Sequence, residues 1–186
     1  MGSLTERQRS IIAGCLLGDG TMRCKENALL EINHAYSQKE YVDWKYSELR
    51  RFVTTPPKIR NGNNARIAYR FTTKSLPALT KIYNQFYHNG SKRIPKDVNL
   101  RPISLAIWFM DDGNKSHRAL YLNTQRFSIA DQYKLIKMLK EQSGLKAYLN
   151  RDKQYYRLRI AVSSVPRFKR IVGRHMLKMF EYKIPL

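Results

Sequence analysis

The sequence has few cysteines, few acidic residues and no long apolar run. Its two cysteines, Cys15 and Cys24, are too few for a disulfide framework, and they show no zinc-ligand spacing. No apolar run approaches the roughly 20 residues that a membrane-spanning helix needs. The N-terminal Met1-Gly2-Ser3 leads directly into a polar segment, so no secretory signal is predicted. Together these absences predict a soluble, intracellular protein with no membrane partner.

The shortage of acidic residues leaves a large positive charge. There are 14 Asp and Glu against 35 Lys and Arg, which gives a formal net charge of +21. The basic residues are spread along the chain and do not form a single tail or one amphipathic membrane helix. A charge of this size predicts a polyanionic partner, and nucleic acid is favoured. Hydrophobic residues make up 42% of the chain, which is enough for a buried core.

An internal repeat determines the expected architecture. Two apolar helical segments end in Asp-Gly: IIAGCLLGDG at 11–20 and SLAIWFMDDG at 104–113. Three further matches follow in the same order: LEIN (30–33) with LYLN (120–123), SLP (75–77) with SVP (164–166), and IP (94–95) with IP (184–185). Four ordered matches predict two similar halves, residues 1–95 and 96–186.

Each half is predicted to contain a helix, a hairpin, a helix, a second hairpin and a last helix. The expected elements, first half then second, are strands at 28–33 and 119–123, amphipathic helices at 39–53 and 129–142, and hairpin turns at 61–64 and 150–154. Thr5 and Gln8 form a capping-box pattern before the first helix, and Pro102 is suited to the first turn of its counterpart. Ser75 and Ser164 are expected to cap the last helices.

Asp19 and Asp112 end the two apolar helices, where the helix dipole is already negative. A divalent metal or a basic side chain should therefore compensate them. The small residues Ala13, Gly14 and Gly18 would let the helices pack closely and bring both carboxylates to one end of a shared interface. An isolated Asp-Gly is typically a helix stop with a solvated Asp. Two copies in a strongly basic repeat favour a shared site instead.

The two Asp-Gly segments resemble the paired LAGLIDADG motifs of single-chain homing endonucleases, and the similarity extends over nearly all of the chain. The segments LAIWFMDDG and LYLNTQRFS, with the endings KRIP and YKIP, resemble the monomeric intron-encoded subgroup that includes the yeast mitochondrial omega nuclease. The resemblance implies an α+β fold. Two pseudo-symmetric αββαββα halves would pack through the motif helices, and their antiparallel sheets would form a DNA-binding saddle.

The resemblance also implies a metal site. The last acidic residue of each motif, Asp19 or Asp112, would bind the ion, and Gly18 and Asp111 could add only backbone carbonyls. Mg²⁺ is the expected ion, and Mn²⁺ or Ca²⁺ could occupy the same sites. The sequence departs from the family pattern at Ile107 and Asp111, where small residues are common.

A basic catalytic residue near each metal site is implied as well. It is Lys183 in the second half, whereas in the first half the choice stays open between Lys92 and its neighbour Arg93. Polar residues of the first hairpins commonly help to position water in this family, and the candidates here are Glu31, Asn33 and Gln125. The histidines lack metal-ligand spacing and are expected to be structural or to contact DNA; they are His34, His88, His117 and His175.

The hairpins are expected to read DNA from the major groove. Along the strand 155–160, alternation points Tyr156, Leu158 and Ile160 toward the helices and the residues between them outward. The predicted DNA-binding residues are Arg60, Arg66, Arg70, Arg126, Tyr155, Arg157 and Arg159. Each outward arginine can contact either a base or a phosphate, and phosphate contacts position the protein without specifying sequence.

The resulting hypothesis is a site-specific endonuclease of the intron or intein homing type. It would act as a monomer on a long, imperfectly palindromic double-stranded DNA target, with each half cutting one strand. The alternatives are an intron maturase that binds intron RNA and a non-catalytic nucleic-acid-binding regulator on the same fold. A scaffold need not keep Asp19, Asp112 or Lys183, so their presence favours the nuclease.

Overall fold

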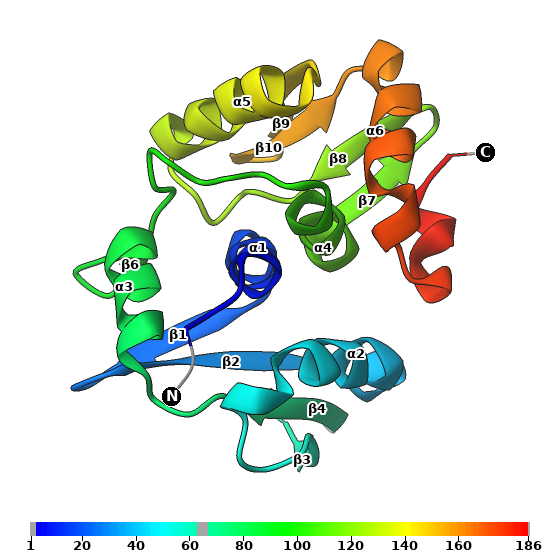
Figure 1. Ribbon diagram of the computed structural model, residues 1–186. Helices are drawn as coiled ribbons and strands as arrows, with labels where there is room; N and C mark the ends of the chain where they lie inside the picture. The colour runs from blue at the N-terminus through cyan, green and yellow to red at the C-terminus, as the bar shows by residue number, and fades with distance from the viewer. Residues whose placement is uncertain (1–2, 63–66, 186) are drawn as a thin grey trace.

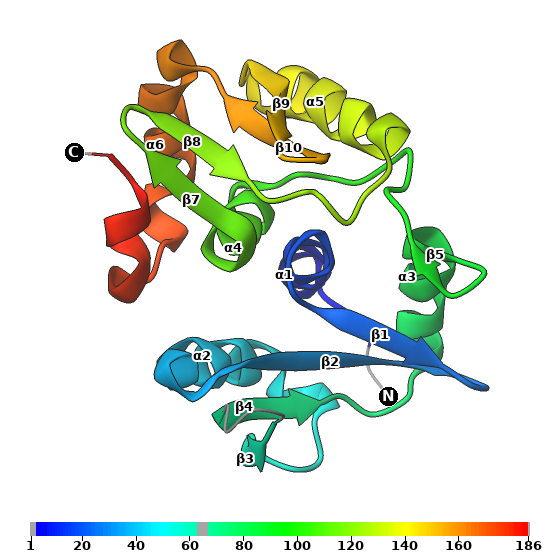
Figure 2. The same ribbon diagram turned by 180° about the vertical axis from the view of Figure 1, so that it is seen from behind.

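The computed structural model describes residues 3–62 and 67–185 and contains two halves of like topology (Figure 1 and Figure 2). The first half comprises α1 (Glu6–Leu17), β1 (Thr21–Cys24), β2 (Ala28–Ala35), α2 (Lys39–Leu49), β3 (Lys58–Asn61), β4 (Ile67–Thr72) and α3 (Pro77–Phe86). The second comprises α4 (Pro102–Asp112), β7 (Gly113–Ser116), β8 (Ala119–Leu122), α5 (Ile129–Ser143), β9 (Ala147–Asp152), β10 (Tyr155–Ile160) and α6 (Val165–Val172). A small hairpin of β5 (Tyr87–His88) and β6 (Ser91–Lys92) follows α3. The α+β fold and the order of elements in each half are confirmed, whereas the division after residue 95 stays a prediction.

Each half contributes one antiparallel four-stranded sheet. The strand orders are β1-β2-β4-β3 and β7-β8-β10-β9, so the two sheets share one topology. Figure 1 shows α1 and α4 side by side in the middle of the molecule, with one sheet on each side of the pair. Both Asp-Gly segments therefore lie at the boundary between the halves.

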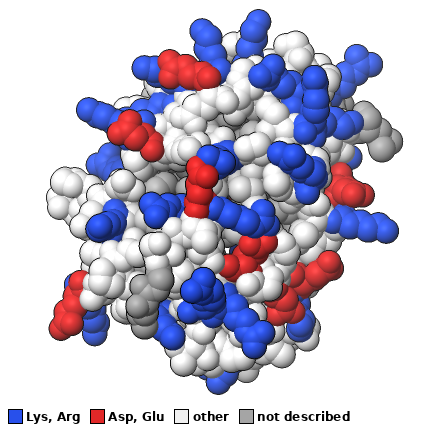
Figure 3. Space-filling model, in the orientation of Figure 1, with Lys and Arg blue, Asp and Glu red and all other residues white. Residues whose placement is uncertain are grey.

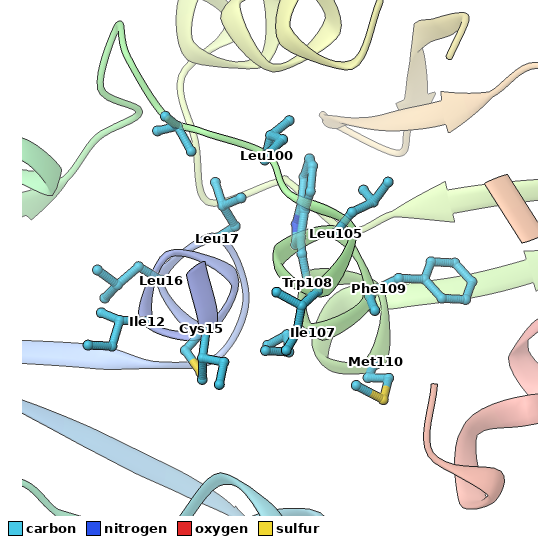
Figure 4. Packing of buried hydrophobic residues seen from close by; sticks show 14 of the residues in the cluster. Ile12, Cys15, Leu16, Leu17, Leu100, Leu105, Ile107, Trp108, Phe109 and Met110 are labelled. Carbon is cyan, nitrogen blue, oxygen red and sulfur yellow. The ribbon is translucent and has the colours of Figure 1, made fainter. Parts of the chain in front are cut away.

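Close packing of α1 against α4 depends on glycine. A Cβ atom at Gly14 would lie 2.7 Å from the Ser104 carbonyl oxygen and 2.9 Å from Cβ of Ile107, which is too close for any larger residue without a shift. The apolar side chains around this crossing form one buried cluster (Figure 4), which includes Ile12, Cys15, Leu16 and Leu17 of α1 and Leu105, Ile107, Trp108, Phe109 and Met110 of α4. The expected close approach is confirmed at Gly14. Ala13, which was also expected to allow this approach, instead lines a surface groove beside α3.

Local signals located most helix ends correctly. The Thr5 hydroxyl accepts a hydrogen bond from the Gln8 amide, and the Gln8 side chain accepts one from the Thr5 amide, as a capping box requires. Pro102 begins α4, and Gly144 ends α5 with a left-handed φ of 63°. Within the described residues, no helix combines the length and apolar character that crossing a membrane would require.

Two local predictions were wrong. Neither Ser75 nor Ser164 caps a last helix through its side chain: α3 is preceded by Leu76, and the Ser164 hydroxyl accepts the Lys146 amide instead. That bond ties α6 to the start of β9, so a tertiary partner replaces the local cap. The second-half hairpin turn is also tighter than 150–154, because β9 continues to Asp152. The first-half turn lies partly outside the described residues.

Candidate active site

The structure brings Asp19 and Asp112 together at the ends of α1 and α4. The guanidinium of Arg126 lies beside both: its Nη2 is 3.5 Å from Asp19 Oδ1 and 3.7 Å from Asp112 Oδ2. Its Nη1 donates a hydrogen bond to the Gly18 carbonyl at 3.2 Å, at the end of α1. Arg126 thus supplies the positive charge that two carboxylates at negative helix ends require.

The Asp112 carboxylate is incompletely satisfied. Its Oδ2 atom is buried and has no hydrogen-bond partner among the described residues. Burial raises the pKa of Asp112 to about 7, and the negative charge of Asp19 adds to the effect. Burial and the charge of Asp111 also raise the pKa of Asp19. Two carboxylates that repel each other, one with an oxygen that accepts no hydrogen bond, fit a hard divalent cation held by oxygen ligands.

One lysine lies beside each carboxylate. Lys92 Nζ donates to the Gly20 carbonyl at 2.6 Å and to the Gly18 carbonyl at 3.3 Å, on either side of Asp19. Lys183 Nζ donates to the Met110 carbonyl at 2.6 Å, near the end of α4. Burial lowers the pKa of both lysines, and that of Lys92 falls to about 8 with a further contribution from the charge of Arg126. The neighbouring Arg93 is exposed, so the geometry favours Lys92 as the first-half basic residue.

A buried polar cluster behind Asp19 was not predicted from the sequence. The Asp111 carboxylate accepts hydrogen bonds from Lys45 Nζ at 2.9 Å and from the Tyr41 hydroxyl at 2.7 Å. Its second oxygen accepts the backbone N–H of Asp19 at 3.2 Å. The Asp111 side chain was expected to play no part in the site, but it makes the central contacts of this cluster. Although burial opposes ionisation, the Lys45 ammonium lowers the pKa of Asp111 below its ordinary value.

His34 belongs to the same cluster. Its Nε2 lies 3.0 Å from Lys45 Nζ, and its Nδ1 lies 3.7 Å from Asp19 Oδ2. Burial, together with the neighbouring Lys45 charge, lowers the pKa of His34 to about 4, so the imidazole is neutral near pH 7. Among the described residues, ligand atoms of Asp19, His34 and Asp111 all lie within 4.8 Å of one another. Asp111 is already engaged by Lys45, which leaves Asp19 as the available carboxylate.

The cluster had one detectable signal. Tyr41, Lys45 and Leu49 share one face of α2 at helical spacing, and all three are fully buried. A lysine on the buried face of an amphipathic helix usually extends its ammonium to solvent. Here the ammonium finds a carboxylate on another helix, which local sequence cannot reveal.

The predicted alternation along β10 is confirmed. Leu158 and Ile160 are buried, Tyr156 is half-buried, and Tyr155 and Arg159 are exposed on the other face of the sheet. Arg157, on the same face, stacks over the Tyr121 ring at 4.4 Å and donates to Asn123 at 3.4 Å.

On the first-half sheet, Arg70 of β4 lies opposite Asn33 of β2 and Lys58 of β3 in the strand register, and Arg60 is exposed. Arg66 lies outside the described residues, and Arg126 lies at the carboxylates rather than on a strand.

Two of the candidate water-positioning residues are engaged by protein groups: Glu31 pairs with Arg23 at 2.8 Å, and Gln125 donates to Asp152 at 2.8 Å. Figure 3 shows Lys and Arg spread over one face of the molecule and more numerous there than Asp and Glu, which lie between them.

Comparisons with known proteins give a consistent result. A family model described as the LAGLIDADG DNA endonuclease family matches residues 9–168. The chain is 26% identical over 197 residues to "Probable intron-encoded endonuclease 1" of Wickerhamomyces canadensis, covering 98% of this chain and 85% of that protein. It is 27% identical over 131 residues to cytochrome b mRNA maturase bI2 of Debaryomyces hansenii, covering 68% of this chain and 50% of the maturase. Other curated relatives are also covered only in part, for 48% or 66% of their length.

Solved structures show the same fold. The homing endonuclease I-WcaI bound to its DNA recognition sequence aligns over 100% of this chain and 89% of its own, with a TM-score of 0.91 and 24% identity. I-DmoI in complex with DNA and Ca aligns over 87% of each chain, with a TM-score of 0.54 and 17% identity.

Proposed function

The chain belongs to the LAGLIDADG DNA endonuclease family, and from this premise we propose that it is a site-specific endonuclease that cuts both strands of a DNA duplex. The observation that carries the proposal is the convergence of Asp19 and Asp112 at one end of the α1–α4 pair, with a buried Asp112 oxygen that accepts no hydrogen bond from the described residues. A structural pair of aspartates at this position would be satisfied by protein groups alone.

Asp19 and Asp112 would hold Mg²⁺, and Mn²⁺ or Ca²⁺ would suit the same oxygen ligands. When bound, such an ion supplies positive charge that polarises the scissile phosphate and promotes ionisation of a water molecule. The carbonyls of Gly18 and Asp111 are the nearest backbone oxygens in sequence and are proposed as additional ligands.

The basic side chains would stabilise the charge that develops on the phosphate. Lys92 and Lys183 already donate hydrogen bonds beside the carboxylates, so each half provides one ammonium group. With a pKa lowered to about 8, the Lys92 ammonium can release a proton near neutral pH, and the resulting amine can take one up. Arg126 adds a charge that both halves share.

The two sheets would bind the duplex on either side of the cleavage site. Their outward-facing basic and aromatic residues are suited to base edges and phosphates in the major groove. The proposed contacts are Arg60, Arg66, Arg70, Tyr155, Arg157 and Arg159, with Arg126 near the scissile phosphates. Because one chain carries two related but different sheets, the proposed target is long and imperfectly palindromic, and the proposed active form is a monomer.

The test is cleavage of a randomised double-stranded DNA library in Mg²⁺, comparing the intact protein with Asp19→Asn and Asp112→Asn. We expect double-strand cuts at a defined sequence by the intact protein and loss of these cuts in both variants, which should still bind DNA. Asp97→Asn is the matched control: it makes the same change at an exposed position outside the site and should cleave normally. Cleavage that survives in both site variants would overturn the proposal.

An intron maturase is the second candidate, because the similarity to cytochrome b mRNA maturase bI2 covers 68% of this chain. In that case the basic surface would bind intron RNA. No DNA cleavage with any divalent metal, together with tight binding of a structured intron RNA in a filter assay, would support it over the nuclease.

A further inference from the structure

A fully buried ion pair joins the two halves beside Asp19. Lys45 of α2 and Asp111 of α4 both have completely buried side chains, and their charged atoms are 2.9 Å apart. The Lys45 ammonium also lies 4.0 Å from the centre of the Tyr41 ring. Apolar residues of similar size usually stabilise a protein at least as well as a buried ion pair does. Stability alone therefore does not account for these charges.

The contacts of Asp111 point to a role in holding Asp19. Lys45 and Tyr41 hold one carboxylate oxygen, and the other accepts the backbone N–H of Asp19 at 3.2 Å. Gly18 makes this approach possible, because a Cβ atom there would lie 2.6 Å from Asp111 Oδ2. The carboxylate thus anchors the backbone from which the Asp19 side chain extends.

The second half has no equivalent arrangement. Aligning the two Asp-Gly motifs places Gly18 opposite Asp111. Aligning LEIN with LYLN, or the start of α2 with that of α5, places Leu135 opposite Lys45. Leu135 is fully buried and apolar. At the positions that would anchor Asp112, both the carboxylate and its lysine are therefore missing.

We propose that Asp111, held by Lys45, is a positioning residue for Asp19 alone and so supports the cleavage of one DNA strand much more than the other. This inference rests on the proposed endonuclease function. Neither side chain need touch DNA or metal, because the effect is transmitted through the backbone of Asp19.

The experiment compares two paired substitutions. Lys45→Met/Asp111→Leu removes both charges and the acceptor for the Asp19 amide. Lys45→Met/Asp111→Asn removes both charges but keeps an acceptor oxygen. Changing both partners together avoids leaving one buried charge unpaired, which would destabilise the fold. Leu135→Met, at the position matching Lys45, is the control for a change of packing in the other half.

The first readout is the cleavage rate of each strand, measured on a duplex labelled at both 5′ ends. We expect Lys45→Met/Asp111→Leu to slow one strand by roughly tenfold to a hundredfold, as disrupted support of a metal ligand does, so that nicked DNA accumulates. The slowed strand should be the one that Lys92→Met slows, because Lys92 lies on the Asp19 side. Lys45→Met/Asp111→Asn should restore much of the rate, and Leu135→Met should cut both strands normally.

The second readout needs neither DNA nor metal. Amide hydrogen exchange followed by NMR should be at least about tenfold faster at Asp19 in the Leu-containing pair than in the Asn-containing pair. Equal slowing of both strands, or equal exchange at Asp19 in the two pairs, would refute the positioning role. Failure of the intact protein to cut any DNA would refute the proposed function instead, and amide exchange would still decide whether Asp111 anchors Asp19.

Discussion

Replacing Gly14 by alanine tests whether contact between α1 and α4 sets both stability and the geometry of the site. The added methyl group would lie 2.7 Å from the Ser104 carbonyl oxygen, and a backbone atom cannot rotate out of the way. Overpacking of this kind costs about 1–3 kcal/mol, and alanine recovers about 1 kcal/mol through its better helix propensity. Because the clash is with a backbone atom, its cost should lie near the upper part of the roughly 1–3 kcal/mol range. We therefore expect the free energy of unfolding to fall by about 1–2 kcal/mol in total.

For a chain of this length, that loss corresponds to a Tm lower by roughly 2–8 °C. Because α1 and α4 must shift apart to admit the methyl group, cleavage of both strands should slow together. Thermal unfolding and strand-resolved cleavage measure the two effects. Gly173→Ala is the control: its φ of −50° is helical and no atom lies within 4 Å of the added methyl group, so it should be neutral or stabilising. A Gly14→Ala protein as stable as the intact one would refute the reasoning.

Three further predictions follow from charge. The pKa of Asp112 is raised to about 7, so protonation of Asp112 stabilises the metal-free fold below pH 7, and this contribution is lost as pH rises through 7. The increase in Tm caused by Mg²⁺ should therefore grow from pH 6 to pH 8. An increase in Tm that does not depend on pH would contradict this. Lys45→Met leaves the Asp111 carboxylate buried without its cation. It should lower the free energy of unfolding, measured with urea, by about 3–5 kcal/mol, and adding Asp111→Leu should recover most of this loss. DNA affinity measured by fluorescence anisotropy should fall about a thousandfold or more between about 50 and 200 mM salt if six or more phosphates are contacted, and a shallow slope would exclude such an interface.

The features that the sequence predicted well are local or repeated. The Thr5–Gln8 capping box, the Gly144 helix end and the alternation along β10 depend on neighbours within a few residues. The pairing of the Asp-Gly helices was predictable because the motif occurs twice, and the order of helices and hairpins along each half followed from the same repeat. Local patterns and an internal comparison are enough for these features.

The features that were missed depend on partners distant in the chain. Asp111 finds Lys45 only because α2 packs against the end of α4, and no periodicity reports that contact. Ser164 was expected to cap its own helix, but its hydroxyl accepts the Lys146 amide instead. His34 has no ligand-like spacing, yet the fold places it beside Asp19. In each case a tertiary contact overrode the local preference.

The Lys45–Asp111 pair also makes the two halves non-interchangeable. If two first halves were to associate through their motif helices, each buried Lys45 would face a glycine in place of a carboxylate. If two second halves did so, each buried Asp111 would face a leucine in place of its ammonium. Either assembly would bury unpaired charge, at a cost of several kcal/mol per ion. Only the mixed pairing satisfies both residues, so expressing the halves as separate chains should yield a heterodimer and neither homodimer.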